Sequence, residues 1–158
     1  MIKADLHIHT TCSDDSEITP ERLIARAQEA GLGCVAVADH NTAAGGLKLR
    51  EMAPPFRVIV AEEILTPEGE IIGLFIQETI PQGLSPEETI KRIRDQGGLV
   101  CVPHPFDRFR SSAMQEPALE RIAGLIDIVE VSNARTLPFQ DLMRPQKFAE
   151  KYGKLMGA

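Results

Sequence analysis

The sequence has no apolar run that approaches the ~20 residues of a membrane-spanning helix, so we expect no membrane partner. Its first residues, Met1 to Asp5, lack the basic and apolar regions of a secretory signal, which favours a cytoplasmic protein. Cysteine is also scarce. Cys12, Cys34 and Cys101 are odd in number and far apart, so they fit reduced thiols better than a disulfide framework or a CxxC zinc site. Cys34 and Cys101 lie in apolar runs and are expected to be buried.

Aromatic residues are few, and acidic residues outnumber basic ones. Aromatic residues make up 4% of the chain and the net charge is -6, which argues against broad electrostatic attraction to nucleic acid or anionic lipid. The sequence also lacks a basic stripe rich in aromatic residues, of the kind that binds single-stranded nucleic acid. The chain of 158 residues is otherwise ordinary for a globular protein, with 43% hydrophobic and 25% charged residues. We expect a single domain over residues 1–158.

Short β-branched runs alternate with helical patterns along the chain. We expect strands at 2–8, 34–38, 57–61, 70–76, 99–102 and 126–131, helices at 20–30, 42–52, 85–96, 117–123 and 138–151, and the start of a further strand at 154–158. The turn sequence Thr66-Pro67-Glu68-Gly69 predicts a hairpin or a bulged excursion. The repeated β-then-α order predicts an α/β fold with a parallel sheet, either an open doubly wound sheet or a closed barrel. In both folds, functional residues lie at the carboxyl ends of the strands.

Side chains that can bind metal ions gather at these strand ends. The set comprises all four histidines and several carboxylates: His7, His9, His40, His104, Asp5, Asp14, Asp39, Glu62 and Glu63. His7 and His9 are two residues apart on one strand, so they point to the same face. Imidazole and carboxylate ligands suit Zn²⁺, Mn²⁺ or Fe²⁺. Two or more such ions, about 3.5–4 Å apart, could activate a bridging water and clamp the oxygens of a phosphoryl transfer.

Each of these residues has a simpler explanation when it is taken alone. A lone histidine is more often a structural hydrogen-bonding residue than a ligand. Asp39 precedes Asn41-Thr42 and could cap a helix, and Glu62-Glu63 could be a solvated strand end. One shared site is nevertheless more economical than separate explanations for four histidines. The pattern therefore predicts a multinuclear metal site.

Five segments resemble motifs of the PHP (polymerase and histidinol phosphatase) family, and they occur in the order of that family. They are Asp5-Leu6-His7-Ile8-His9-Thr10 with Ser13-Asp14, Val37-Ala38-Asp39-His40-Asn41-Thr42, Ala61-Glu62-Glu63-Ile64, Val102-Pro103-His104-Pro105-Phe106 and Val129-Glu130-Val131-Ser132-Asn133-Ala134-Arg135. The first two segments are the most specific. The last resembles a segment of the small phosphoesterase branch of the family.

The resemblance implies a distorted (β/α)7 barrel that hydrolyses phosphate esters with two to three divalent metal ions (Zn, Mn or Fe). The residues that it implies as metal ligands are His7, His9, Asp14, His40, Glu63 and His104. It places the bridging carboxylate at Glu63 rather than Glu62. Glu130 and Asn133 are weaker candidates for ligands.

The resemblance also suggests residues that support catalysis without binding a metal ion. We expect Asp39, together with Asp5, to orient imidazoles. Arg135 is expected to neutralise the phosphate of the substrate, with a solvated surface arginine as the alternative. Arg108 and Arg110 are further options for that role.

One family motif has no counterpart in the sequence. The family normally carries a final Gly-Ser-Asp-x-His motif that supplies one aspartate and one histidine to the metal ions. The sequence stops at Leu155-Met156-Gly157-Ala158, where that motif would begin. We therefore expect a PHP domain that is incomplete at its C-terminus and lacks its last strand or strands. It is either a fragment of a longer protein, which we favour, or a shortened form.

Three functions follow as alternatives. The favoured one is metal-dependent hydrolysis of a small phosphorylated metabolite or nucleotide. The second is an exonuclease that acts on short oligonucleotides, for which the same metal site would serve. The third is a catalytically incomplete metal-binding or structural module, which the missing motif supports for the chain as it stands. The sequence leaves the substrate, the metal identity and the oligomeric state open.

Overall fold

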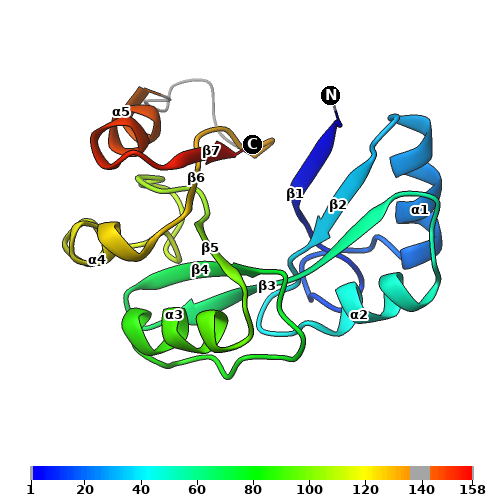
Figure 1. Ribbon diagram of the computed structural model, residues 1–158, viewed down its shortest axis with the longest axis horizontal. Coiled ribbons are helices and arrows are strands. Elements are labelled where there is room, and N and C mark those ends of the chain that lie inside the picture. Colours follow the sequence, from blue (N-terminus) through cyan, green and yellow to red (C-terminus); the bar gives the residue numbers. More distant parts are fainter. Residues whose placement is uncertain (1, 136–142, 158) are drawn as a thin grey trace.

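The computed structural model describes residues 2–135 and 143–157. In this part of the chain, seven strands form one curled sheet, and the helices cover its outer face (Figure 1). The strands are β1 (Ala4–Ile8), β2 (Cys34–Val37), β3 (Arg57–Thr66), β4 (Gly69–Leu74), β5 (Leu99–Val102), β6 (Ile128–Glu130) and β7 (Leu155–Gly157). The helices are α1 (Pro20–Glu29), α2 (Ala44–Glu51), α3 (Pro86–Asp95), α4 (Glu116–Ile122), a short 3₁₀ turn η1 (Ala123–Leu125) and α5 (Met143–Tyr152).

The strands are ordered in the sheet as they are in the chain, from β1 to β7. Strands β1, β2 and β3 pair in parallel, β4 is antiparallel to both of its neighbours, and β5, β6 and β7 are again parallel. The predicted hairpin is therefore confirmed as β3–β4. The sheet curls into a half-barrel, with β1 and β7 at its two ends (Figure 1). This confirms the predicted α/β fold, in the form of a half-barrel.

Several predicted elements differ in length from the structure, and β3 differs most. Strand β3 continues to Thr66, beyond the predicted end at residue 61, because β4 pairs with its second half through Glu62↔Gly73 and Glu63↔Ile72. The two glutamates therefore lie inside a strand and not at its end. Helix α2 begins at Ala44 and not at residue 42. The predicted start of the last helix at residue 138 lies outside the described residues.

Local sequence signals explain where two helices begin. Thr19 accepts a hydrogen bond from the backbone N–H of Arg22 at the start of α1, and Ser85 accepts one from Glu88 at the start of α3. In both helices a proline follows the cap and occupies the first turn, where its missing N–H costs nothing. No helix within the described ranges is long and apolar enough to cross a membrane.

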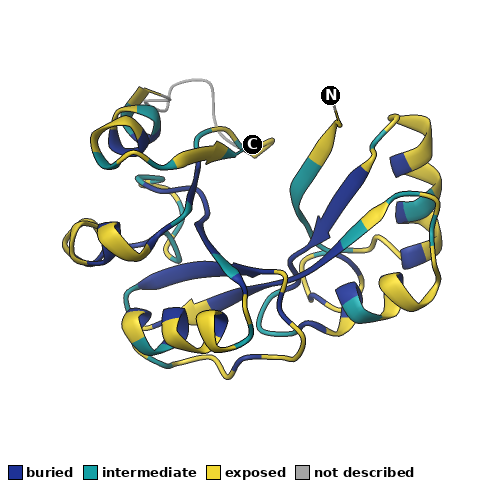
Figure 2. Cartoon of the chain, in the orientation of Figure 1, coloured by how far each residue is buried: buried dark blue, intermediate teal, exposed yellow. Residues whose placement is uncertain are grey.

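Alternate residues of the strands build the core on both faces of the sheet. In β2, Val35 and Val37 pack with α1 and α2, whereas Cys34 and Ala36 join a cluster without helix residues. That second cluster lines the concave face and includes Cys101, so both cysteines expected to be buried are buried. Figure 2 shows the buried middle of the sheet and the more exposed strands at its ends. The carboxyl ends of the parallel strands meet at one rim of the half-barrel.

Candidate metal centre

Glu63 lies at the centre of the four histidines. Its Oε2 atom is 3.3 Å from Nε2 of His7, 3.2 Å from Nε2 of His9 and 3.3 Å from Nδ1 of His40. Its Oε1 atom is 2.8 Å from Nε2 of His104. The curled sheet thus brings together side chains from β1, the end of β2, β3 and the end of β5. These are five of the six predicted metal ligands.

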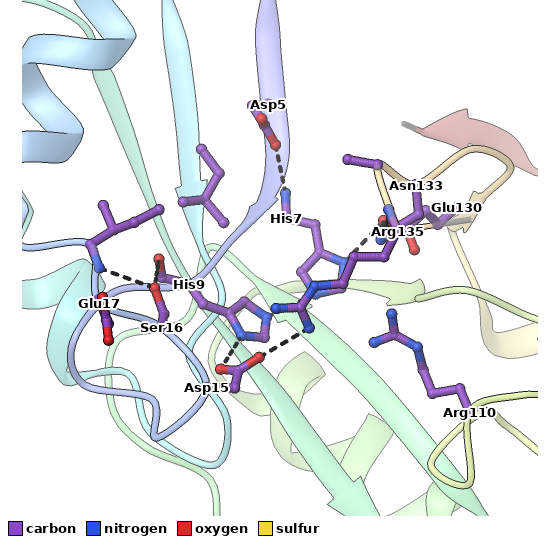
Figure 3. A pocket seen from close by; sticks show the side chains of 13 residues that line it. Asp5, His7, His9, Asp15, Ser16, Glu17, Arg110, Glu130, Asn133 and Arg135 are labelled. Carbon is purple, nitrogen blue, oxygen red and sulfur yellow. Dashed lines mark hydrogen bonds and ion pairs between the residues drawn. The ribbon is translucent and has the colours of Figure 1, made fainter. Parts of the chain in front are cut away.

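The sixth predicted ligand, Asp14, does not lie with the others. Asp14 is exposed, and the neighbouring Asp15 takes the place at the cluster. Oδ1 of Asp15 is 3.0 Å from Nδ1 of His9, and its Oδ2 is 3.7 Å from Nε2 of His40 (Figure 3). Adjacent aspartates in a loop cannot be distinguished by spacing alone. The turn that follows Ser13 directs Asp15, and not Asp14, toward the imidazoles.

Asp39 holds that loop in place. Its carboxylate, which is fully buried, accepts hydrogen bonds from the backbone N–H and Oγ1 of Thr10 and from Oγ of Ser13. Oγ of Ser13 in turn accepts a hydrogen bond of 2.7 Å from the backbone N–H of His40. Asp39 therefore acts on the backbone of the loop and of His40 and not on an imidazole. Asp5 is similar, since it accepts a 3.2 Å hydrogen bond from the backbone N–H of His7.

Glu70 is a member of the cluster that the sequence did not indicate. It is the second residue of the antiparallel strand β4. Its Oε1 lies 3.3 Å from Nδ1 of His40, and its Oε2 lies 3.5 Å from Nε2 of His104. The sequence predicts ligands at the carboxyl ends of strands, whereas Glu70 lies near the start of one. The hairpin register could have found it. Glu70 is paired with Leu65, which is two residues from Glu63, so both glutamates point to one face.

Glu62 and Glu63 occupy opposite faces of β3. Glu62 is fully buried, and its Oε2 accepts a 2.9 Å hydrogen bond from the backbone N–H of Ile80. Burial raises the pKa of Glu62 to about 7. Only Glu63 faces the histidines, which is the arrangement expected when successive residues of a strand alternate.

Glu130, at the end of β6, connects two of the histidines. Its Oε1 lies 2.9 Å from Nδ1 of His7, and its Oε2 accepts a 2.7 Å hydrogen bond from the backbone N–H of His104. Asn133 donates from its side-chain amide to Oε1 of Glu130 at 3.1 Å. Glu130 therefore contacts the ring nitrogen of His7 that does not face Glu63, and it fixes the orientation of His7 as carboxylates commonly do for metal-binding histidines. Asn133 contacts Glu130 and lines the cavity beside the cluster.

The backbone around His104 is strained and held from two sides. His104 has φ 31° and Phe106 has φ 67°, which is the left-handed region that side chains other than glycine rarely adopt. Glu130 holds the N–H of His104. The ring of Phe106 lies edge to face with Phe148 of α5, at 5.8 Å, and 4.4 Å from the guanidinium carbon of Arg144. These contacts keep the His104 side chain directed at the cluster.

Arg135 and Arg110 flank a cavity of about 580 Å³ beside the cluster (Figure 3). The Arg135 side chain is 63% exposed, and its guanidinium lies 3.2 Å from Oδ2 of Asp15. Arg110 reaches the cavity from the loop after β5, whereas Arg108 is exposed and does not line it. Two guanidinium groups therefore face the carboxylate-rich cluster across the same open space.

The carboxylate of Glu63 and the imidazole of His7 shift each other's pKa. Burial acts to raise the pKa of Glu63, but the imidazoles of His104, His7 and His9 outweigh it and hold that pKa well below its usual value. For His7, burial acts to lower the pKa, and the carboxylates of Glu130 and Glu63 raise it to about 10. A divalent cation at this position would compete with the proton that His7 carries.

The donor atoms fit divalent metal ions. Three groups have ligand atoms that lie within 4.8 Å of one another: His7, His9 and Glu63; His9, Asp15 and His40; and His40, Glu63 and Glu70. Oε2 of Glu63 and Oε2 of Glu70 are buried without a hydrogen-bond partner. A buried carboxylate oxygen without a partner is costly, and a bound cation would satisfy it. Mixed imidazole nitrogen and carboxylate oxygen donors of this kind suit Zn²⁺, Mn²⁺ or Fe²⁺.

Comparison with known proteins agrees with the fold and the motifs. Residues 5–97 match the family model of the PHP domain. An uncharacterized protein of Methanocaldococcus jannaschii is 44% identical over 146 residues, which cover 84% of this chain and 82% of that protein. A 5'-3' exoribonuclease of Haemophilus influenzae is 30% identical over 147 residues, or 83% of this chain and 53% of that enzyme.

A solved structure from Bacteroides vulgatus has the same fold. It is a two-domain protein that contains a "predicted PHP-like metal-dependent phosphoesterase", and it aligns with a TM-score of 0.81 at 16% identity, over 98% of this chain and 50% of the other. The chain thus spans about half the length of that protein and of the exoribonuclease. From the family match and the archaeal relative, we conclude that this chain belongs to the PHP-domain family.

Proposed function

We propose that this protein hydrolyses phosphate esters with two or three divalent metal ions held by the histidine–carboxylate cluster. The observation that carries the proposal is Glu63, whose two oxygens face four imidazoles while Oε2 has no hydrogen-bond partner. When bound, such ions lower the pKa of a water molecule and neutralise charge on the transferring phosphoryl group. His7, His9, His40, His104, Asp15, Glu63 and Glu70 would supply the ligands.

The residues around the ligands would orient the site and the substrate. Glu130 fixes His7 and the backbone of His104, and Asp39 fixes the loop that carries Asp15. Arg135 would bind a phosphate oxygen through its paired donors, and it would exchange its contact with Asp15 for that oxygen. The cavity of about 580 Å³ is partly open, the Arg135 side chain that lines it is 63% exposed, and the cavity would admit a small phosphorylated metabolite or a nucleotide.

A direct assay can test this function. The chain is loaded with Zn²⁺, Mn²⁺ or Fe²⁺, its metal content is measured, and phosphate release is followed on a panel of mononucleotides and sugar phosphates. Glu63→Gln should abolish release, and Glu62→Gln should retain it, because Glu62 lies on the other face of β3 and a neutral amide can keep the acceptor for Ile80. A metal-loaded chain that releases no phosphate from any member of the panel would count against a monoesterase.

Exonuclease activity on short oligonucleotides is the second candidate, and the named 5'-3' exoribonuclease relatives favour it. The same ligand cluster would serve, with the oligonucleotide leaving through the open side of the cavity. Rates on a 5'-phosphorylated oligonucleotide and on the matching mononucleotide separate the two functions. Full metal binding with no hydrolysis of either substrate would instead indicate a metal-binding structural module.

A further inference from the structure

The two ends of the candidate metal centre differ in donor chemistry. The group of His7, His9 and Glu63 offers two imidazole nitrogens and one carboxylate oxygen. The group of His40, Glu63 and Glu70 offers one nitrogen and two carboxylates. Glu63 is common to both groups, so Glu70 makes the difference. Carboxylate oxygens suit harder ions such as Mn²⁺ and Mg²⁺, whereas imidazole-rich sites suit Zn²⁺.

Glu70 is also placed where a cation is needed. Its side chain is 5% exposed, its Oε2 has no hydrogen-bond partner, and it shares the interior with the fully buried Glu63. Within the described ranges, no lysine or arginine forms an ion pair with either carboxylate; the partners are the imidazoles of His40 and His104. Two buried carboxylates so close together repel each other unless positive charge lies between them.

The backbone holds Glu70 at this position. Its N–H donates a 2.9 Å hydrogen bond to the carbonyl of Ser112, and its strand partner is Leu65 of β3. The preceding Gly69 has φ 131° and packs so closely on the backbone of Met114 that a Cβ would overlap it. Glu70 therefore cannot move away from the cluster without breaking the hairpin or its contact with the 112–114 segment. A carboxylate fixed in this way acts as a preorganised ligand.

We propose that Glu70 selects the ion at its end of the centre. The ratio of Mn²⁺ affinity to Zn²⁺ affinity is then higher at this end than at the end with His7 and His9. The inference rests on the proposed metal-dependent function and adds a division of labour between the two ends. It concerns the ratio of affinities, because Zn²⁺ binds more tightly than Mn²⁺ to most sites of this kind.

The test compares three variants by their metal content. Metal-free chain is equilibrated with buffered mixtures of Mn²⁺ and Zn²⁺ and then analysed by mass spectrometry of the metals and by the Mn²⁺ electron paramagnetic resonance signal. The wild type should retain about one Mn²⁺ per chain over a range of Zn²⁺ concentrations. Glu70→His should lower the Mn²⁺-to-Zn²⁺ ratio about tenfold or more. Glu70→Gln should weaken binding at this end and lower the ratio by a smaller factor, because it removes the charged oxygen without adding an imidazole.

Glu78→His is the matched control, because it adds an imidazole at an exposed position outside the metal groups. It should keep the wild-type ratio. An equal ratio in wild type and in both Glu70 variants would overturn the role of Glu70 while leaving the metal-dependent function in place. A wild-type chain that binds neither ion would overturn both. Glu70→Gln keeps the side-chain shape, so it remains informative if Glu70→His does not fold.

Discussion

Gly45, in the first turn of α2, lies against the carboxylate that anchors the Asp15 loop. A Cβ atom at this position would overlap Oδ2 of Asp39 and would lie 2.5 Å from Oγ1 of Thr10. Both atoms belong to the buried network in which Asp39 accepts hydrogen bonds of 2.8 Å from Oγ1 of Thr10 and 3.1 Å from Oγ of Ser13. Gly45→Ala must therefore displace Asp39, although it adds only one methyl group.

The expected loss can be worked out from these contacts. A hydrogen bond to a charged group contributes about 1.5–3 kcal/mol, and overpacking a filled site costs about 1–3 kcal/mol. Alanine is better than glycine in a helix by about 1 kcal/mol, which opposes the loss. Loss of one Asp39 hydrogen bond together with the strain gives a net destabilisation of about 1.5–5 kcal/mol. For a chain of this size, that lowers the melting temperature by about 3–20 °C.

Thermal unfolding followed by circular dichroism checks this expectation, with Gly124→Ala as the control. A Cβ at Gly124 meets nothing within 4 Å, so that variant should stay within about 0.5 kcal/mol of the wild type. Gly45→Ala should also weaken Zn²⁺ binding, because the displaced loop carries Asp15 and contacts the backbone of His40. If Gly45→Ala melts together with the wild type and the control, the argument that Asp39 anchors this loop is refuted.

Three further substitutions probe other parts of the structure. Glu130→Gln should weaken metal affinity about 10–100-fold in a chelator competition, because an amide cannot accept from His7 and the backbone of His104 together; unchanged affinity would contradict this role. Burial acts to raise the pKa of Asp127, but Arg94 and a backbone N–H hold it below its usual value. Ionised Asp127 therefore stabilises the folded chain above pH ~4, and this contribution is lost as the pH falls through the folded-state pKa. Asp127→Asn should thus be less stable than the wild type in urea unfolding at pH 7, with a difference that shrinks below pH ~4; a constant difference would argue against the ion pair. Gly69→Ala should lower the melting temperature by about 6 °C or more, because its φ of 131° and the nearby Met114 backbone exclude a side chain, and a wild-type melt would disprove that packing.

The order and type of the elements could be predicted from sequence because periodicity and turn chemistry agree locally. The apolar run at β2 and the caps Thr19 and Ser85 are examples. The length of β3 could not be predicted in the same way. Glu62 and Glu63 interrupt its apolar pattern. They can be buried because β4 pairs beside them and because their partners come from elsewhere in the chain: the backbone N–H of Ile80 for Glu62, and the imidazoles for Glu63. Tertiary contacts therefore decide where that strand ends.

The site could be predicted in part for a related reason. The histidines follow strands that run in parallel, and the carboxyl ends of parallel strands share one rim, so their sequence positions indicate proximity. Glu70 breaks this rule, because β4 runs in the opposite direction and brings the start of a strand to the same rim. The choice between Asp14 and Asp15 depends on the turn after Ser13, which Asp39 anchors from another strand end. Neither fact is visible from spacing.

The curl of the sheet is what turns these separate residues into one centre. His7 stands on the first strand and Glu130 on the sixth, and they are 123 residues apart in the chain, yet Nδ1 of His7 lies 2.9 Å from Oε1 of Glu130. In a flat sheet, strands about 4.8 Å apart would separate β1 from β6 by about 24 Å. The hydrogen bond therefore spans the concave side of the half-barrel and joins its two halves at the rim. Because the same carboxylate also holds the strained backbone of His104, the curvature of the sheet and the geometry of the ligands depend on each other.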